Sequence, residues 1–209
     1  MPRPHPPIAA LLTLTALALT ACSPAHVADT PTPSSETPST STVATSSGAP
    51  TVQNPVPAKA LAGNPCDTAL TTADLTKFIG PPDPGKPGDT PLGPRCFWAN
   101  ASGNGATTTV FYQTNSHGLS DAYQNVKSTA VHWEELEAVQ SYPAVAYRAT
   151  GDVDTAGVDH CQVVVRISNS LAHSAGITLS ELAKGKHVNP CTAARSIADQ
   201  VLTNIKARS

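Results

Sequence analysis

The chain has 209 residues and a formal net charge of −2, with 13% charged and 4% aromatic residues. A chain of this length allows one domain with additional segments, but it is short for two full domains. Because no stretch of the sequence is strongly basic, we expect no nucleic-acid partner.

Residues 1–21 have the features of an export signal. Arg3 precedes an apolar run over residues 8–21. This run is shorter than the ~20 residues that a helix needs to cross the hydrocarbon core of a membrane. A positive start, a short apolar middle and small residues before a cleavage point are typical of a signal peptide rather than of a membrane span.

Cys22 directly follows Leu19, Thr20 and Ala21. This order resembles the bacterial lipobox, which implies transfer of diacylglycerol to the Cys22 thiol, cleavage before Cys22 and acylation of the new amino terminus. Two or three acyl chains such as palmitate anchor a protein stably, whereas one chain binds only marginally. We therefore expect a lipoprotein attached at Cys22 to the extracytoplasmic face of the cell membrane. The alternative is a plain secretory signal with an incidental cysteine.

Residues 22–60 consist largely of Ser, Thr, Pro and Ala and contain almost no large apolar side chains. Such a segment buries too little apolar surface to offset its conformational entropy. Its prolines favour an extended polyproline II conformation, which makes a semi-rigid spacer. We expect a disordered tether over residues 22–60 and a folded domain over residues 61–209.

The expected domain contains four cysteines, Cys66, Cys96, Cys161 and Cys191. An even number of cysteines in an exported domain indicates two disulfides, because the compartment is oxidising. A zinc site is disfavoured because the sequence has no Cys-x-x-Cys pair. Four cysteines allow three connectivities, and the sequence does not choose between them. We favour Cys66–Cys96 and Cys161–Cys191, since each pair spans a helix and a strand that could pack side by side.

Local patterns predict alternating helices and strands in the domain. Thr71 supplies an N-cap for the first helix, and β-branched and aromatic runs between turn residues predict strands. Asn189 and Pro190 open a final helix that carries an apolar stripe. The expected elements, in order, are a helix up to Gly80, a loop to Pro94, a strand from Arg95, a turn at 103–105, a strand over 107–112, a helix over 119–129, strands around 132–139 and 144–149 divided by residues 141–143, a loop over 151–157, strands over 161–167 and 171–179, and a helix over 190–205.

These elements predict an α+β fold, with an antiparallel sheet of about five to six strands and flanking helices. The order of five short motifs also resembles an actinobacterial lipoprotein family that is classified as a domain of unknown function (DUF3558) and is related in layout to mycobacterial envelope lipoproteins. The motifs are Asn64-Pro65-Cys66, Cys96-Phe97-Trp98, Tyr142-Pro143-Ala144-Val145, Cys161-Gln162-Val163 and Asn189-Pro190-Cys191. The resemblance implies a Mog1/PsbP-like α/β/α arrangement with two disulfides. It transfers no catalytic residue, because the family has none established.

The expected loop over residues 151–157 comes nearest to a cation site. Asp152 and Asp154 have the spacing of the first ligands of a calcium loop, which further needs an oxygen ligand two residues later and a glutamate at the twelfth position of the loop. The chain has Ala156 and Val163 at these two positions. We expect a solvated turn there.

Histidines, acidic residues and serines form no recognisable site either. The histidines of the domain lack His-x-x-x-His and His-x-His spacing, and they are His117, His132, His160, His173 and His187. Glu134, Glu135 and Glu137 offer carboxylates for glycoside hydrolysis, but on an alternating strand they indicate a solvated face. No Gly-x-Ser-x-Gly motif and no glycine-rich phosphate loop is present. We predict no catalytic residue, no metal and no cofactor; a site assembled from residues distant in sequence stays open.

Two non-enzymatic functions therefore remain. In the first, the domain is a binding or sensor module that contacts an envelope protein or glycan through its sheet face or the loop around residues 80–94. In the second, it is a carrier with an apolar pocket for a lipid or small ligand. We favour the first, because the few aromatic residues could largely be used up in a modest core. A sheltered cavity of several hundred Å³ would favour the carrier.

Overall fold

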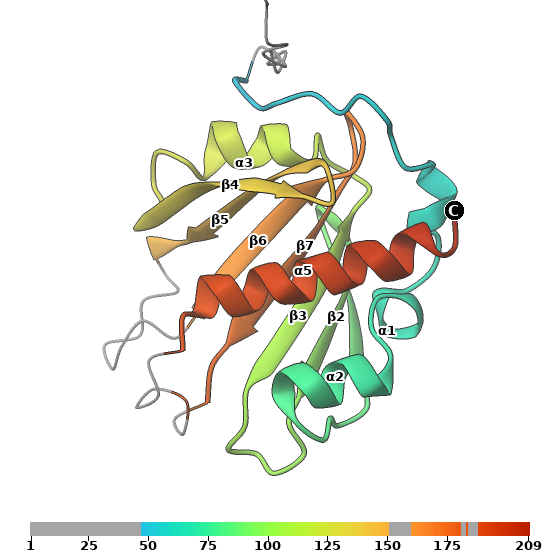
Figure 1. Cartoon of the computed structure of the whole chain (residues 1–209), viewed down its shortest axis with the longest axis vertical. Coiled ribbons are helices and arrows are strands. Elements are labelled where there is room, and N and C mark those ends of the chain that lie inside the picture. The colour runs from blue at the N-terminus through green and yellow to red at the C-terminus, as the bar shows by residue number, and fades with distance from the viewer. Residues whose placement is uncertain (1–46, 151–159, 181–182, 184–187) are drawn as a thin grey trace, which may run out of the picture. The chain divides into compact units, whose positions relative to one another are not determined.

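The computed structural model describes residues 47–150, 160–180, 183 and 188–209. One antiparallel sheet has seven strands in the order β1-β2-β3-β7-β6-β5-β4 (Figure 1). The elements are η1 (Ala58–Leu61), α1 (Pro65–Thr68), α2 (Thr72–Ile79), β1 (Lys86–Thr90), β2 (Gly93–Ala99), β3 (Thr107–Gln113), α3 (Leu119–Asn125), β4 (His132–Val139), β5 (Tyr142–Arg148), β6 (His160–Arg166), β7 (Ala172–Thr178) and α5 (Pro190–Lys206).

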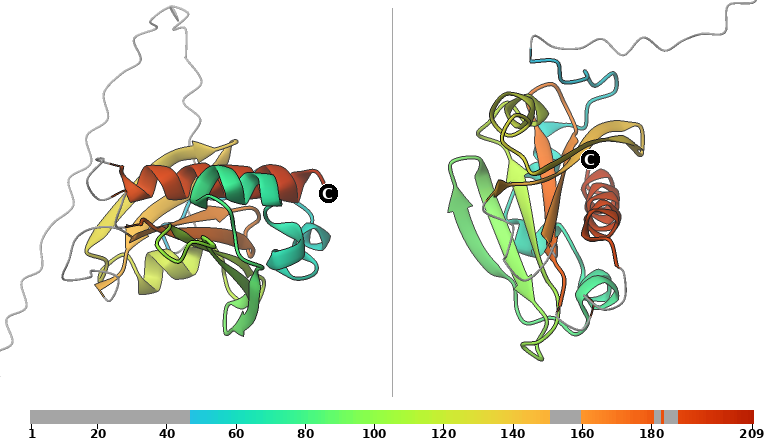
Figure 2. Two further views of the ribbon diagram at one scale, coloured as in Figure 1. Left: turned by 90° about the horizontal axis from the view of Figure 1, so that it is seen from below. Right: turned by 90° about the vertical axis from the view of Figure 1, so that its left-hand side faces the viewer.

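Helices lie on both faces of the sheet. Helix α5 crosses one face with α2 beside it, and α3 lies on the opposite face (Figure 2). The predicted α+β class is therefore confirmed, as is an antiparallel sheet with flanking helices and two disulfides. The expected five to six strands were too few, because the sheet has seven.

The core lies between α5 and the sheet. Because successive strand residues point to opposite faces, every second residue of β6 and β7 faces this helix. The apolar stripe of α5 is fully buried against them, and burying each large aliphatic side chain contributes roughly 1.5–3 kcal/mol. The buried stripe consists of Ala194, Ile197, Ala198, Val201, Leu202 and Ile205.

Both disulfides connect the partners that we expected. Cys66 of α1 is bonded to Cys96 of β2, with the Cα atoms 5.0 Å apart. Cys161 of β6 is bonded to Cys191 in the first turn of α5, with a Cα separation of 4.9 Å. Each closes a loop with a sequence separation of 30 residues, which is worth about 3–4 kcal/mol on the chain-entropy model.

The loop expected between α2 and β2 contains a strand instead. Residues Lys86–Thr90 form β1, which pairs antiparallel with β2 and places Pro87 opposite Cys96. A proline lacks the backbone N–H that a central strand needs, but the edge of a sheet tolerates it. Strand β1 is thus defined by its pairing with β2, and its own composition predicted a turn.

The packed region begins earlier than the boundary expected at residue 61. Val52, Val56 and Ala60 are buried, and the Val56 backbone N–H donates to the Ile167 carbonyl at 2.9 Å. The buried Arg166 guanidinium donates to the Pro50 carbonyl at 2.8 Å. The small apolar residues before residue 61 were expected to be too few to form a core. They are buried because they pack against apolar surface of the folded domain.

Smaller shifts occur around β4 and β5. The expected helix over 119–129 ends at Asn125. The turn between β4 and β5 lies at Gln140 and Ser141, which have φ values of 49° and 73°. Residues 142 and 143, expected in this turn, instead begin β5. The expected loop over 151–157 lies outside the described residues.

Candidate functional site

Two hollows adjoin α2 and α5 and share one lining residue, Phe78. The first, which we call the apolar hollow, has a volume of about 400 Å³. That volume lies in the range of small-molecule sites, which are mostly apolar with a few polar groups. Its main apolar lining consists of Phe78, Ile79, Ile177, Leu179, Val188 and Ala193.

The walls of the apolar hollow are held by the end of α2. The helix begins with a reciprocal cap, in which Thr71 and Asp74 each accept a hydrogen bond from the other's backbone N–H. It ends at Gly80, whose φ of 81° suits glycine. The Asn100 side chain from the β2–β3 turn donates to the Ile79 carbonyl at 2.6 Å. Asn100 therefore fixes the last turn of α2 and also contributes to the polar rim of the hollow.

The second hollow, which we call the cationic hollow, has a volume of about 380 Å³ and lies between α2, α5 and the β4–β5 turn. Lys77 and Arg195 line it, together with one acidic side chain, Asp199. Gln140 donates to the Asp199 carboxylate at 3.0 Å. The formal charge of the lining side chains is therefore positive, and the single carboxylate already accepts a hydrogen bond.

The β4–β5 turn is fastened to α5 by Gln140. Left-handed backbone conformations are unfavourable for residues other than glycine. Here the Gln140 side chain donates to the backbone oxygen of Asp199 at 3.0 Å and to the Thr203 hydroxyl at 2.8 Å, and it accepts from Lys206 at 3.3 Å. These bonds offset the strain and position the turn as one wall of the cationic hollow.

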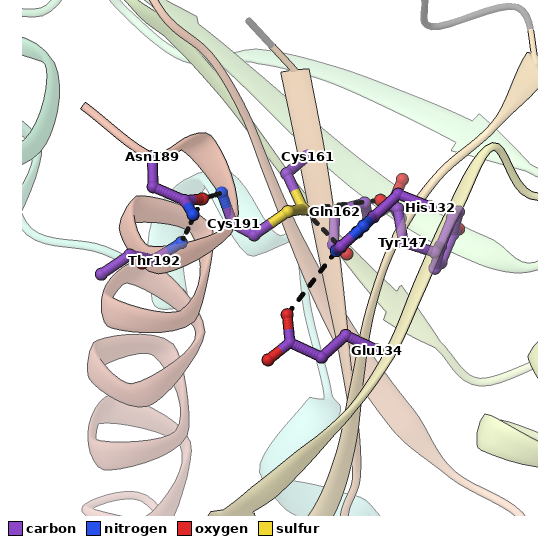
Figure 3. Close-up of a disulfide and its surroundings, with 8 residues drawn as sticks. All are labelled: His132, Glu134, Tyr147, Cys161, Gln162, Asn189, Cys191 and Thr192. Carbon is purple, nitrogen blue, oxygen red and sulfur yellow. Dashed lines mark hydrogen bonds and ion pairs between the residues drawn. A yellow bond between two sulfur atoms is a disulfide. The ribbon is translucent and has the colours of Figure 1, made fainter. Parts of the chain in front are cut away.

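A smaller hollow of about 230 Å³ lies beside the Cys161–Cys191 disulfide. There the His132 Nε2 and Glu134 Oε2 atoms are 3.6 Å apart (Figure 3). The Asn189 side chain accepts from the backbone N–H of Cys191 at 2.8 Å, so the start of α5 is already capped. This hollow is below the usual size of ligand sites, and its Asn189 side chain stabilises the start of α5.

The sheet face opposite α5 carries a row of side chains that crosses all seven strands. Directly paired residues in an antiparallel sheet point to the same face. The strand register gives the row Trp133, Tyr147, Gln162, Gly176, Thr109, Phe97 and Lys86. At one end the Trp133 ring stacks on Tyr147 and meets the edge of Tyr123, with centroid separations of 6.4 and 5.2 Å. This aromatic group holds α3 on the sheet.

Most of the aromatic residues pack in the core or against it, as expected. Trp98 and Tyr112 are buried, and Trp133, Tyr142 and Tyr147 pack against buried apolar clusters. Phe97 and Phe111 are only half-buried, on the face opposite α5. Burial, followed by the nearby Glu135, raises the pKa of Tyr123 to about 12.

The histidines are scattered over the described part of the chain. His117 lies 3.3 Å from Asp121, and the Nδ1 atom of His160 lies 3.0 Å from the Thr178 hydroxyl. His173 is fully buried, and burial lowers its pKa to about 3. His187 lies outside the described residues. Among those residues, no three His, Cys, Asp or Glu side chains are placed to hold a metal ion.

The acidic residues of β4 do not form a carboxylate pair. Glu134 lies near His132, whereas Glu135 points to the opposite face, where Lys127 donates to its carboxylate at 2.7 Å. This hydrogen bond lowers the pKa of Glu135. The alternation of side chains along a strand explains the separation.

Some predicted site residues lie outside the described part of the chain, and two residues of the cationic hollow were not predicted from the sequence. Cys22, Asp152 and Asp154 lie outside the described residues. Lys77 and Arg195 were not predicted, because α2 and α5 are far apart in sequence. A weak signal was available, since both residues interrupt amphipathic helices next to apolar positions.

The sequence profile of a family described as a protein of unknown function (DUF3558) matches residues 17–204. The chain belongs to this family. The DUF3558 match includes all five cysteines and both hollows beside α2 and α5. No curated protein and no solved structure matches the chain, so the likeness to Mog1 and PsbP stays an expectation. In the described part of the chain, no helix has the length and apolar character needed to span a membrane.

Proposed function

We propose that this DUF3558 protein is a lipid-anchored, non-catalytic binding domain of the cell envelope. We further propose that its ligand occupies the groove formed by the apolar and cationic hollows. The observation that carries this proposal is the apolar hollow, which combines buried aliphatic walls with a polar rim and a volume of about 400 Å³. A pocket of this composition suits a small molecule or a lipid chain.

The cellular location in this proposal rests on the order Leu19-Thr20-Ala21-Cys22. The two disulfides are compatible with it, since disulfides persist in oxidising compartments outside the cytoplasm. Lipid attachment at Cys22 would hold the domain at the membrane, where apolar ligands are concentrated.

The groove shifts our preference toward a carrier of a lipid or small apolar ligand. A sheltered cavity of several hundred Å³ was the feature expected to favour that function; the apolar hollow has this volume but is open to solvent on one side. Val188, an apolar residue of its lining, is 44% exposed. Its buried floor includes Ile177, which is 2% exposed. An opening beside an apolar floor allows a ligand to enter without unfolding the core.

A second candidate is binding of an envelope protein or glycan on the sheet face opposite α5. The observation that favours it is the presence of half-buried Phe97, Phe111 and Tyr147 on this face. Aromatic residues are enriched where proteins bind one another. The apolar hollow ranks first because it has the volume and lining of a ligand site, whereas a partly polar sheet face is also usual for a solvated sheet.

Native mass spectrometry of the full chain after incubation with envelope extract tests the binding site. We expect a discrete small-molecule adduct, and we expect Val188→Asp to remove it by placing a charge at the mouth of the apolar hollow. Val131→Asp is the matched control, because Val131 is also exposed, at 49%, and does not line either hollow. No adduct, or one that survives Val188→Asp, would contradict the proposed site.

Membrane fractionation tests the anchor separately. We expect the wild-type chain in the membrane fraction and the Cys22→Ser chain in the soluble fraction, because a serine cannot accept the thioether-linked lipid. A Cys22→Ser chain that stays with the membrane would contradict the proposed attachment.

A further inference from the structure

We propose that the groove binds a single-chain amphiphile with an anionic head group, with its chain in the apolar hollow and its head in the cationic hollow. This inference rests on the proposed function and specifies the ligand class. Its basis is the juxtaposition of two chemically different hollows that share Phe78.

The two hollows adjoin the same face of α5 and share Phe78 of α2. On α5, Ala193 lines the apolar hollow and Ser196 lines the cationic hollow, and residues three apart lie on the same face of a helix. On α2, Lys77 and Ile79 point to different sides of the helix, and among the described residues Phe78 alone lines both hollows. We place the ligand across Phe78, with one end in each hollow.

The apolar hollow accepts a hydrocarbon chain. Ile79, Ile177 and Leu179 are at most 9% exposed and present aliphatic surface, and Phe78 is half-buried at the junction. Transfer of each methylene from water to such surroundings is favourable. The polar atoms of Asn100 are already engaged, since its amide group donates to the Ile79 carbonyl and accepts from Ser102. The Asn100 side chain therefore needs no hydrogen bond from a ligand.

The cationic hollow is complementary to a carboxylate or phosphate head group. Within the described residues, neither Lys77 nor Arg195 has an ion-pair partner. Lys77 lies over the Phe78 ring, 5.3 Å from its centroid, and Arg195 donates only to the Glu137 carbonyl, at 3.4 Å. An arginine binds carboxylate and phosphate oxygens strongly, with two parallel hydrogen bonds where geometry allows. Asp199 in the same hollow and Asp74 near Lys77 offset part of this positive charge. A neutral head group would gain nothing from the remaining charge, and a cationic one would be repelled.

The test measures binding of three ligands that share a sixteen-carbon chain and differ in the head group. They are palmitate, 1-hexadecanol and hexadecyltrimethylammonium, used below the concentrations at which they aggregate. The protein is the full chain with Cys22→Ala, so that no attached acyl chain competes for the groove. We expect palmitate to bind at least tenfold more tightly than hexadecanol and the ammonium compound to bind most weakly.

Charge-reversal variants test where the head group lies. We expect the double variant Lys77→Glu, Arg195→Glu to weaken palmitate binding at least tenfold and to leave hexadecanol binding within twofold. Lys86→Glu is the matched control, because Lys86 is an exposed residue of the edge strand β1, away from both hollows. We expect it to change neither affinity by more than twofold. Palmitate binding that withstands the double variant would overturn the placement of the head group.

A substitution at the mouth of the apolar hollow separates this inference from the proposed function. We expect Val188→Asp to weaken palmitate and hexadecanol alike, and Val131→Asp to weaken neither. If all three ligands bind equally and Val188→Asp weakens them all, the anionic head group is wrong but the groove remains a ligand site. If none binds while envelope extract still yields a Val188-dependent adduct, the amphiphile class is wrong. If extract also yields no adduct, the proposed function fails with it.

Discussion

Two neighbouring residues of β7 show two different ways in which this sheet buries polar groups. His173 and Ser174 are both fully buried but point to opposite faces. On the α5 face, neither ring nitrogen of His173 has a hydrogen-bond partner among the described residues. On the opposite face, the Ser174 hydroxyl accepts from the Gln113 and Gln162 side chains at 3.3 and 2.9 Å.

The surroundings of His173 and Ser174 explain how each residue affects the stability of the fold. Paired with Tyr112 and Val165 in the register, His173 sits among apolar side chains that stabilise only its neutral form. Ser174 belongs to a hydrogen-bonded group in which each buried amide has an acceptor. Burial of His173 therefore makes stability depend on pH, whereas the Ser174 group contributes polar contacts that depend on complete pairing.

The largest expected effect is on the α5 face. Leu202→Ala removes a fully buried side chain from the stripe of α5, and we expect the free energy of unfolding to fall by about 2–5 kcal/mol because a cavity remains. Chemical denaturation measures it. Thr192→Ala on the exposed side of the same helix is the control, and it should cost less than about 1 kcal/mol. Equal losses in the two variants would mean that α5 does not close the core.

The next effect is the pH dependence caused by His173. Its folded-state pKa of about 3 lies below the ordinary value of 6.5, so the unfolded chain binds more protons between these values. Stability is therefore complete above pH 6.5 and is lost as the pH falls toward 3. Between pH 7 and 5 the expected loss from this group is about 2 kcal/mol.

His173→Leu should remove this part of the pH dependence. Denaturation at pH 7 and pH 5 would show a smaller difference in the free energy of unfolding for the variant than for the wild type. His117→Leu is the control, since the His117 side chain is 84% exposed and should leave the difference unchanged. An unaltered pH dependence in His173→Leu would show that His173 is not buried in its neutral form.

A smaller effect is expected on the opposite face. Ser174→Ala leaves the Gln113 amide without its acceptor, and Gln113 is only 5% exposed. A buried polar group that loses its partner costs about 1–3 kcal/mol, and we expect the lower half of this range because Gln162 is partly solvated. Thermal unfolding measures the change. An unchanged melting temperature would mean that the two amides find other partners.

The smallest effect is expected in the middle of the row on the same face. Thr109 is half-buried and lies between Phe97 and Gly176 in the register. Thr109→Ala should change the free energy of unfolding by no more than about 0.5 kcal/mol, as is usual for surface positions. A larger loss would show that this face is packed more tightly than its partial exposure indicates.

The sequence by itself determined the features that depend on local chemistry. Thr71 and Asp74 identified the start of α2, the apolar stripe identified α5, and β-branched runs identified β3 and β6. The four cysteines of the domain indicated two disulfides, and the favoured pairing, in which each bond joins a helix to a strand, is confirmed. These features were predictable because neighbours in sequence, or a covalent bond, specify them.

Only the tertiary structure decided the features that depend on distant partners. Lys86–Thr90 forms a strand because it pairs with β2 at the edge of the sheet. Val56 is held in place because its backbone N–H donates to the carbonyl of Ile167, directly after β6. Lys77 and Arg195 line one hollow because α2 and α5 pack on the same face of the sheet. His173 is isolated by the same helix that the sequence predicted. In each case the deciding contact joins residues far apart in the chain, and no local pattern records such a contact.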